Sequence, residues 1–192
     1  EITFTPSFVN RLDRNTAGLV IGAKNSESLR ILNKAMKENV IDKYYLTLVS
    51  GRLNHDFKID STISKNKNRN KVKRSDDGKR ILTYFKVLES SDKFSFLECK
   101  LITGRTHQIR YSLKENNTPI LGDRKYGDKE LNSQVRKIFG INNQILLSYK
   151  LVFPEIKGLE YLKGKEFVSD KYENMIKLKE KLMELWGDLW LR

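Results

Sequence analysis

The sequence is poor in the residues that build disulfides and metal sites. Its 192 residues include a single cysteine, Cys99, and two histidines, His55 and His107, which lie far apart. One cysteine excludes an intramolecular disulfide and a cluster of cysteine ligands, and a histidine-rich metal centre is not expected either. A lone thiol also favours a reducing, cytoplasmic setting for the protein.

Long hydrophobic runs are absent as well. No stretch approaches the ~18–20 apolar residues that cross a bilayer, and the first residues lack the pattern of a signal peptide. What is present is enough apolar material for a folded core, because 39% of the residues are hydrophobic and 10% are aromatic. The length suits one domain, since domains most often have about 100–150 residues.

Acidic residues are scarce compared with basic ones. The chain has 24 Asp and Glu against 37 Lys and Arg, and its formal net charge is +13. An excess of positive charge this large attracts phosphate polyanions. Nucleic acid is therefore the first candidate partner and an anionic membrane surface the second. A compositional bias towards lysine, with no partner, is the plain alternative.

The hydrophobic pattern predicts more strands than helices. Strands are expected over residues 19–21, 44–49, 81–88, 94–101 and 145–153. Helices are expected after a cap at Asn25 or Ser26, over residues 106–114, and at the C-terminus. Because the strands do not alternate regularly with the helices, we expect the α+β class, with a mixed, mostly antiparallel sheet and flanking helices.

Two segments are interpreted from their side-chain pattern alone. Residues 54–80 are polar and are expected to form a long mobile loop or a hairpin; their basic side chains are Lys65, Lys67, Arg69, Lys71, Lys73 and Arg74. The C-terminal helix has an apolar stripe made of Leu178, Leu182, Leu185, Trp186 and Leu189. We expect this stripe to pack on the sheet, with a partner-binding helix as the alternative.

The first cluster of chemically useful residues surrounds Asp13. Arg11 and Arg14 flank this carboxylate just before Gly18. Neighbouring cations favour the ionised form of a carboxylate, so Asp13 is a candidate nucleophile or base. An ordinary loop with a surface ion pair is the alternative.

A second cluster follows an apolar strand, where Arg105 and Arg110 could hold phosphates or pair with a carboxylate. The alternative is the start of a helix with a solvated basic face. In a third cluster, Tyr44 and Tyr45 should point to opposite faces of a strand, so one can pack in the core while the other lines a cleft. A structural tyrosine pair is the alternative there. Residues 121–127 predict a tight basic loop or a plain turn.

Taken together and in this order, these segments resemble the pseudouridine synthases of the RluA/RluD type. The resemblance is carried by Arg-Leu-Asp-x-x-Thr-x-Gly-Leu at 11–19, Lys-x-Tyr at 43–45, Thr-Gly-Arg-Thr-His-Gln-Ile-Arg at 103–110 and Leu-Gly-Asp-x-x-Tyr-Gly at 121–127. It implies the pseudouridine synthase fold with a central active-site cleft. The sequence departs from the family pattern at four positions expected beside the site and not at the nucleophile, namely Asn10, Ala17, Ser112 and Ser148.

The resemblance also implies how the chain is organised. It implies one catalytic domain over residues 1–192 that lacks the family's N-terminal part and contains no S4-type RNA-binding domain. The first residue, Glu1, is not a methionine, which also predicts that the chain is a fragment. Nothing in the sequence indicates an obligate oligomer, so a monomer is expected.

The activity implied by the resemblance is isomerisation of specific uridines in ribosomal RNA, or in transfer RNA, to pseudouridine. Asp13 would be the catalytic carboxylate, Arg110 its partner, and Tyr45 the ring that stacks on the detached uracil. Residues expected to contact RNA are Arg11, Arg14, Arg105, His107, Gln108 and Lys125. The reaction needs no redox change and no metal, so no cofactor is expected.

Two other functions compete with this one. The first is a basic RNA-binding module of the same fold that has lost activity. The second is an Asp-dependent glycosidase acting on nucleosides. That class usually needs a second carboxylate near the first, and the segment around Asp13 contains no other acid.

Overall fold

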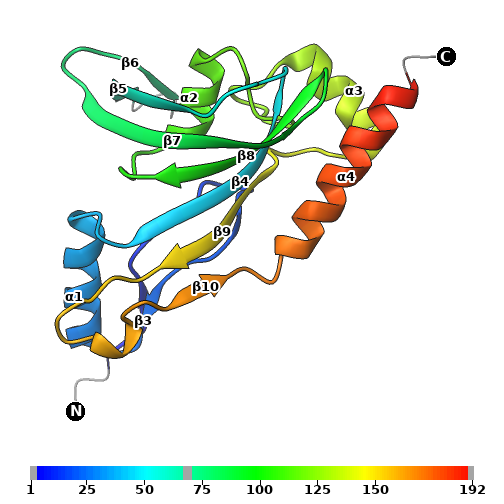
Figure 1. Ribbon diagram of the computed structural model, residues 1–192. Helices are drawn as coiled ribbons and strands as arrows, with labels where there is room; N and C mark the ends of the chain where they lie inside the picture. Colours follow the sequence, from blue (N-terminus) through cyan, green and yellow to red (C-terminus); the bar gives the residue numbers. More distant parts are fainter. Residues whose placement is uncertain (1–3, 67–70, 190–192) are drawn as a thin grey trace.

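The computed structural model describes residues 4–66 and 71–189, except for the side chains of residues 65, 66, 71 and 186–189 (Figure 1). An eight-stranded sheet forms its centre, in the order β10-β9-β4-β8-β7-β5-β6, with β2 paired to β9 outside this path. The β2–β9 pair is parallel and the other pairs are antiparallel. The α+β class with a mixed, mostly antiparallel sheet is therefore confirmed.

The long strands form where the sequence pattern predicts them. Their bounds are Asp42–Ser50 for β4, Lys79–Ser90 for β7, Phe94–Leu101 for β8 and Leu146–Val152 for β9. Alternate residues of β4 enter different cores: Leu46 and Leu48 pack on one face of the sheet, and Tyr45 and Val49 on the other. The short edge strand β10, Glu166–Val168, is not predicted by the sequence pattern.

Residues 54–80 form a hairpin rather than a mobile loop. Strand β5 spans Phe57–Asn66 and pairs with β6, which spans Lys71–Arg74. The two strands turn Ile63 and Val72 into a small core that includes Tyr111 and Tyr126. Lys73 and Arg74 of the predicted basic run are exposed. Lys67 and Arg69 lie outside the described residues, as do the side chains of Lys65 and Lys71.

Helices cover the two faces of the sheet differently (Figure 1). On one face lies α2, Gln108–Glu115, which buries Ile109 and Leu113 against the sheet. The opposite face is covered by α3, Lys129–Phe139, and by α4, Tyr172–Leu189. Helix α1, Ser26–Lys37, packs near the N-terminal end of the chain, and Asn25 caps it by accepting the Ser28 N–H. A 3-10 turn at Glu160–Leu162 completes the helical segments described.

The C-terminal stripe packs on the sheet as predicted, but only in part. Leu182 is fully buried in the core beneath α4, and Leu178 packs against that core. Leu185, about one turn further along α4, is instead 42% exposed. The side chains of Trp186 and Leu189 lie outside the described residues. No helix in the described part of the chain has the length and apolar character needed to cross a membrane.

The prediction of a strand over residues 19–21 is wrong. The structure has two-residue strands on either side, β2 at Ala17–Gly18 and β3 at Gly22–Ala23, and β3 pairs with β1 at Ser7–Phe8. The intervening backbone bonds irregularly, because Ile21 donates its N–H to the Asn10 side chain rather than to a strand. Val20, in the same segment, is 43% exposed.

Candidate active site

A cavity of about 670 Å³ opens on the face of the sheet that α2 covers. Its volume falls in the ~300–1,000 Å³ range of typical ligand sites. Its lining includes the segment around Asp13, strand β4 with Tyr45, and residues 104–110 at the start of α2, together with the end of α1 and one residue each of β8 and β9. The three sequence clusters around Asp13, Arg110 and Tyr45 therefore meet at one cavity. Asp13 and Arg110, which bond to each other there, are 97 positions apart in the sequence.

The turn that carries Asp13 is fixed by backbone and side-chain hydrogen bonds. The Thr16 N–H donates to the Asp13 carbonyl, 2.9 Å away, and Asn15 between them adopts a left-handed φ of 68°. Gln144 donates its side-chain amide to the Arg14 carbonyl at 2.7 Å. The Asp13 carboxylate is thereby held at the cavity, where its side chain keeps 17% exposure.

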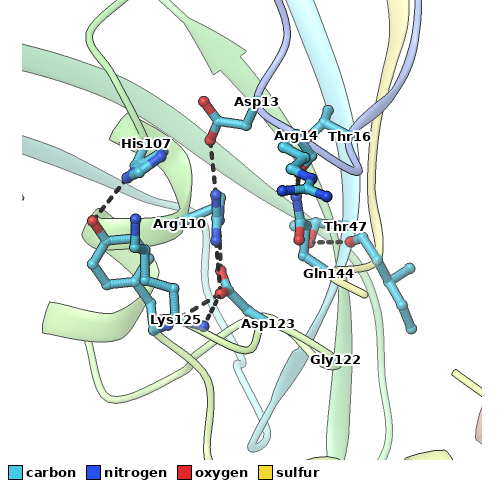
Figure 2. Close-up of polar contacts among 12 residues, drawn as sticks. Asp13, Arg14, Thr16, Thr47, His107, Arg110, Gly122, Asp123, Lys125 and Gln144 are labelled. Carbon is cyan, nitrogen blue, oxygen red and sulfur yellow. Dashed lines mark hydrogen bonds and ion pairs between the residues drawn. The ribbon is translucent and has the colours of Figure 1, made fainter. Parts of the chain in front are cut away.

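Arg110 joins two carboxylates (Figure 2). Its Nη1 donates to Asp13 Oδ2 at 3.2 Å, while Nε and Nη2 donate to the two oxygens of Asp123 at 2.7 and 2.9 Å. Burial lowers the pKa of the Arg110 guanidinium, but the hydrogen bonds and charges of Asp123 and Asp13 more than offset this, and the net shift is upward. Arg110 therefore stays a cation. Two of its three bonds to carboxylates form a bidentate pair with Asp123.

Asp123 is the residue that sequence reasoning missed. Its side chain is fully buried, and its Oδ1 also accepts the backbone N–H groups of Lys125 and Tyr126. Burial by itself raises the pKa of the Asp123 carboxyl, yet these bonds and the Arg110 charge lower it below the ordinary value. The signal in the sequence is an acid placed two and three residues before the backbone N–H groups that it accepts, a spacing typical of a turn.

The two tyrosines of β4 point to opposite faces, as predicted. Tyr45 is 8% exposed and lines the cavity, and burial raises the pKa of its hydroxyl despite a hydrogen bond with the Ser148 side chain. Tyr44 lies on the other face, with the ammonium groups of Lys100 and Lys150 5.4 and 4.5 Å from its ring centroid. Only Tyr45 is therefore placed to meet a ligand in the cavity.

Lys43 is a second buried cation on the cavity wall. It lies two residues before Tyr45 on β4 and is 4% exposed. Its Nζ donates to the Ile41 carbonyl at 3.2 Å. Burial lowers the pKa of its ammonium, against a smaller opposite effect of Asp42.

His107 is buried and lines the cavity. Its left-handed φ of 54° is not helical, so α2 begins at the next residue, Gln108. This conformation explains why the helix begins later than the predicted residue 106. Its Nδ1 lies 2.9 Å from the Tyr126 hydroxyl, which also accepts the Val72 N–H from β6. His107 thus links the cavity to the hairpin.

Gln108 also borders the cavity, but protein groups occupy its side-chain amide. The Nε2 donates to the Leu82 carbonyl and to Thr83 Oγ1, and the Oε1 accepts from Thr103 Oγ1 and from the Arg105 N–H. All four hydrogen-bonding positions of a glutamine amide are then filled. Gln108 fixes the loop that carries Arg105, and its predicted contact with RNA stays a prediction.

The remaining predicted RNA contacts fall into two groups. Arg11 and Arg105 are exposed and line the cavity. Arg14 is exposed on the turn beside the cavity, and Lys125 lies on the Asp123 loop near His107. Neither residue belongs to the cavity lining. In the described ranges, no group of three or more His, Cys, Asp or Glu side chains is arranged to hold a metal ion.

Comparison with known proteins places this arrangement in a family. A profile of the family described as RNA pseudouridylate synthase matches residues 1–115. This chain belongs to the RNA pseudouridylate synthase family. The resemblance drawn from the sequence motifs is thereby confirmed.

Several curated pseudouridine synthases are similar to the chain. Ribosomal large subunit pseudouridine synthase D of Borreliella burgdorferi is 41% identical over 154 residues, which cover 79% of this chain and 45% of that protein. Synthase C of Rickettsia prowazekii is 41% identical over 154 residues, covering 78% and 51%. An uncharacterized RNA pseudouridine synthase of Mycoplasma genitalium is 36% identical over 168 residues, covering 84% and 51%.

Solved structures support the same fold. The human RNA pseudouridylate synthase domain containing 1 superposes with a TM-score of 0.73 at 24% identity, over 88% of this chain and 70% of that one. The chain spans about half the length of the curated pseudouridine synthases it matches.

Proposed function

We propose that the protein converts uridine to pseudouridine in RNA and that Asp13 is the carboxylate that performs the reaction. The observation that carries the proposal is the Asp13–Arg110 contact of 3.2 Å at a cavity that Tyr45 also lines. It occurs in a chain of the RNA pseudouridylate synthase family.

The reaction breaks the bond between N1 of uracil and C1′ of ribose, turns the base, and rejoins it through C5. It requires a charged carboxylate beside the junction of base and sugar. Asp13 fits this requirement because it lines the cavity with its side chain 17% exposed and forms an ion pair with the Arg110 guanidinium through Oδ2. Attack of this carboxylate on the base, attack on C1′, and removal of a proton in a glycal route all use the same placement.

Tyr45 is assigned to the detached base. Its ring is mostly buried on the cavity wall, and burial raises the pKa of its hydroxyl. The hydroxyl is therefore neutral at physiological pH and can donate or accept one hydrogen bond. A ring held in this way offers a flat surface on which uracil can turn without leaving the cavity.

Entry of the nucleotide requires extrusion from its stack, which costs a few kcal/mol. Arg11 is exposed on the cavity lining, two residues before Asp13. Its side chain is long enough to occupy the gap that the extruded base leaves. Arg105, which also lines the cavity, is assigned to a neighbouring phosphate, in keeping with the net charge of +13.

Ribosomal RNA is the favoured substrate, with transfer RNA as the alternative. The support comes from the similar proteins of Borreliella and Rickettsia, which are named ribosomal large subunit pseudouridine synthases. We also infer that residues 1–192 act as one catalytic domain, that no cofactor takes part, and that the domain is a monomer.

The glycosidase alternative loses support from the state of the second carboxylate. Asp123 and Asp13 both bond to Arg110. Asp123, however, is fully buried, and both of its oxygens accept hydrogen bonds. It therefore cannot reach a sugar as an acid or base. An inactive RNA-binding module remains the second candidate, because four positions beside the site depart from the family pattern.

The test is to incubate the purified protein with ribosomal and transfer RNA and to map pseudouridine at nucleotide resolution. We expect wild-type protein to form it and Asp13→Asn to form none, while its RNA affinity stays within a few-fold. Asp170→Asn is the control, because that carboxylate is exposed at the start of α4. Activity of Asp13→Asn on the same uridine would refute the assignment, and RNA binding without modification by wild type would favour the inactive module.

A further inference from the structure

Arg110 divides its donors unequally between two carboxylates. The two bonds to Asp123 measure 2.7 and 2.9 Å and form a bidentate pair, whereas the one bond to Asp13 measures 3.2 Å. Bidentate pairing fixes the plane of a guanidinium, since both donors must lie in that plane. The orientation of Arg110 at the cavity is therefore set by Asp123, which lies away from the cavity lining.

Asp123 is held firmly enough to set that orientation. Gly122 and Asp123 both bond to the Asn132 side chain of α3, through the Gly122 N–H at 2.7 Å and the Asp123 carbonyl at 2.9 Å. Gly122 has a φ of 77°, and a Cβ at this position would lie 2.2 Å from the Asn143 carbonyl oxygen. The loop is thus packed against its neighbours on both sides.

The consequence for Asp13 is a carboxylate that is held at one oxygen only. Among the residues that the structure describes, its Oδ2 accepts from Arg110 and its Oδ1 accepts no hydrogen bond from the protein. Figure 2 shows this second oxygen turned away from Arg110. If the guanidinium paired with Asp13 through two N–H groups, both oxygens would be engaged and their capacity to react would fall.

We propose that Asp123 is a positioning residue. Because it pairs with Nε and Nη2 of Arg110, the guanidinium bonds to only one oxygen of Asp13, and the other oxygen stays free for the reaction. The proposal rests on the proposed function, because it concerns the reactivity of the same carboxylate. Asp123 touches no substrate and acts through Arg110. The single positive charge of Arg110 then orients Asp13 without enclosing it.

The test is the variant Asp123→Asn. An asparagine Oδ1 can still accept the N–H groups of Lys125 and Tyr126, but its Nδ2 replaces Oδ2, is a donor, and cannot accept the Nε–H of Arg110, so the bidentate pair is lost. We expect Arg110 to rotate and to bond both oxygens of Asp13, which a crystal structure of the variant would show directly. In kinetics we expect kcat to fall about 10²-fold with KM for RNA unchanged, the scale of loss that misplacement of a reacting group causes.

Loss of stability alone must be separated from this effect. Leu182→Ala removes a fully buried side chain on the opposite face of the sheet and lowers stability without touching the cavity. At an equal loss in Tm we expect its kcat to stay near the wild-type value. An equal loss of kcat in Leu182→Ala would overturn the proposal.

Two further outcomes would also overturn it: an Asp123→Asn crystal structure in which Arg110 keeps its single bond to Asp13, or a rotated Arg110 with unchanged kcat. The geometric readout does not depend on turnover. If the wild-type protein modified no RNA, the proposed function would fail, and the position of Arg110 in the variant would still decide whether Asp123 directs it.

Discussion

Gln144 donates its side-chain amide to the carbonyl of Arg14, which lies 130 positions earlier in the chain. The same Nε2 lies 3.2 Å from Thr16 Oγ1. Gln144 lies two residues before β9, so these contacts tie the turn of Asp13 to the central sheet. The position of the carboxylate is therefore a property of the tertiary fold and not of the local sequence.

Gly18 completes this attachment and gives the first prediction. It has a φ of 116°, and a Cβ there would lie 2.1 Å from the Ser148 carbonyl oxygen. We expect Gly18→Ala to lower the free energy of unfolding by more than about 1 kcal/mol, measured by chemical denaturation. Activity should fall as well, because β2 would separate from β9 and move the turn of Asp13.

The matched control for this variant is Gly140→Ala. Gly140 also has a left-handed φ, 71°, but nothing lies within 4 Å of a Cβ at that position. It therefore measures the backbone strain alone, and Gly18→Ala should cost clearly more. Equal losses for the two variants would show that the close approach to Ser148 does not matter.

Arg105 gives the second prediction, which concerns binding to RNA. Its side chain is exposed on the cavity lining, while Gln108 holds its backbone N–H. Arg105→Gln should lower RNA affinity and reduce the slope of log K against log salt by about 0.7–0.9, the value for one lost phosphate contact. The chemical step at saturating RNA should not change.

Arg136→Gln serves as the control for Arg105→Gln, because Arg136 is exposed on α3 behind the sheet and away from the cavity. It removes the same charge from the protein. We expect its salt slope to match the wild type. If both variants changed the slope equally, RNA would be responding to net charge and not to a contact at the cavity.

His107 gives the third prediction, a dependence of stability on pH. Burial lowers the pKa of this imidazole below 6.5; Arg110 and Lys125 lower it further, against the opposing charges of Asp13 and Asp123. As the pH falls through about 6.5, the His107 imidazole becomes protonated in the unfolded chain but stays neutral in the folded protein. Stability should therefore decrease from pH 7 towards pH 5.

The measurement is the free energy of unfolding of wild type and His107→Gln across this range. The variant should have the shallower slope, by less than about 1.4 kcal/mol per pH unit, the value for one whole proton. His55→Gln removes an exposed imidazole and should follow the wild type. A wild-type curve that stays flat between pH 7 and pH 5 would contradict a buried, neutral His107.

The sequence pattern was sufficient for four long strands, and the family resemblance for the meeting of three clusters at one cavity. Period-two and helical spacing predict β4, β7, β8 and β9 because these segments bury one or both faces. The same logic does not reveal α3, in which only Val135 is buried, although Asp128 and Gly140 are recognisable caps at its ends. Propensity alone is weak when a helix is mostly exposed.

The site shows a second limit of sequence reasoning. Asp123 and Gln108 are polar residues within recognisable motifs. Local spacing can indicate a turn, as it does for Asp123, but it does not show which other elements the side chain contacts. Their function depends on which groups the fold brings to them: Arg110 for the carboxylate, and Leu82, Thr83 and Thr103 for the amide. Such partners come from different elements and become visible only when the chain is folded.

Strand β6 ends the sheet on one side, and its N–H groups at Val72 and Arg74 have side-chain partners. The Val72 N–H donates to the Tyr126 hydroxyl at 3.1 Å and the Arg74 N–H to the Tyr111 hydroxyl at 2.7 Å. Unpaired N–H groups at a border strand can recruit a strand from another molecule. Two phenolic oxygens occupy these donors, so this border is protected against the intermolecular strand addition that begins aggregation.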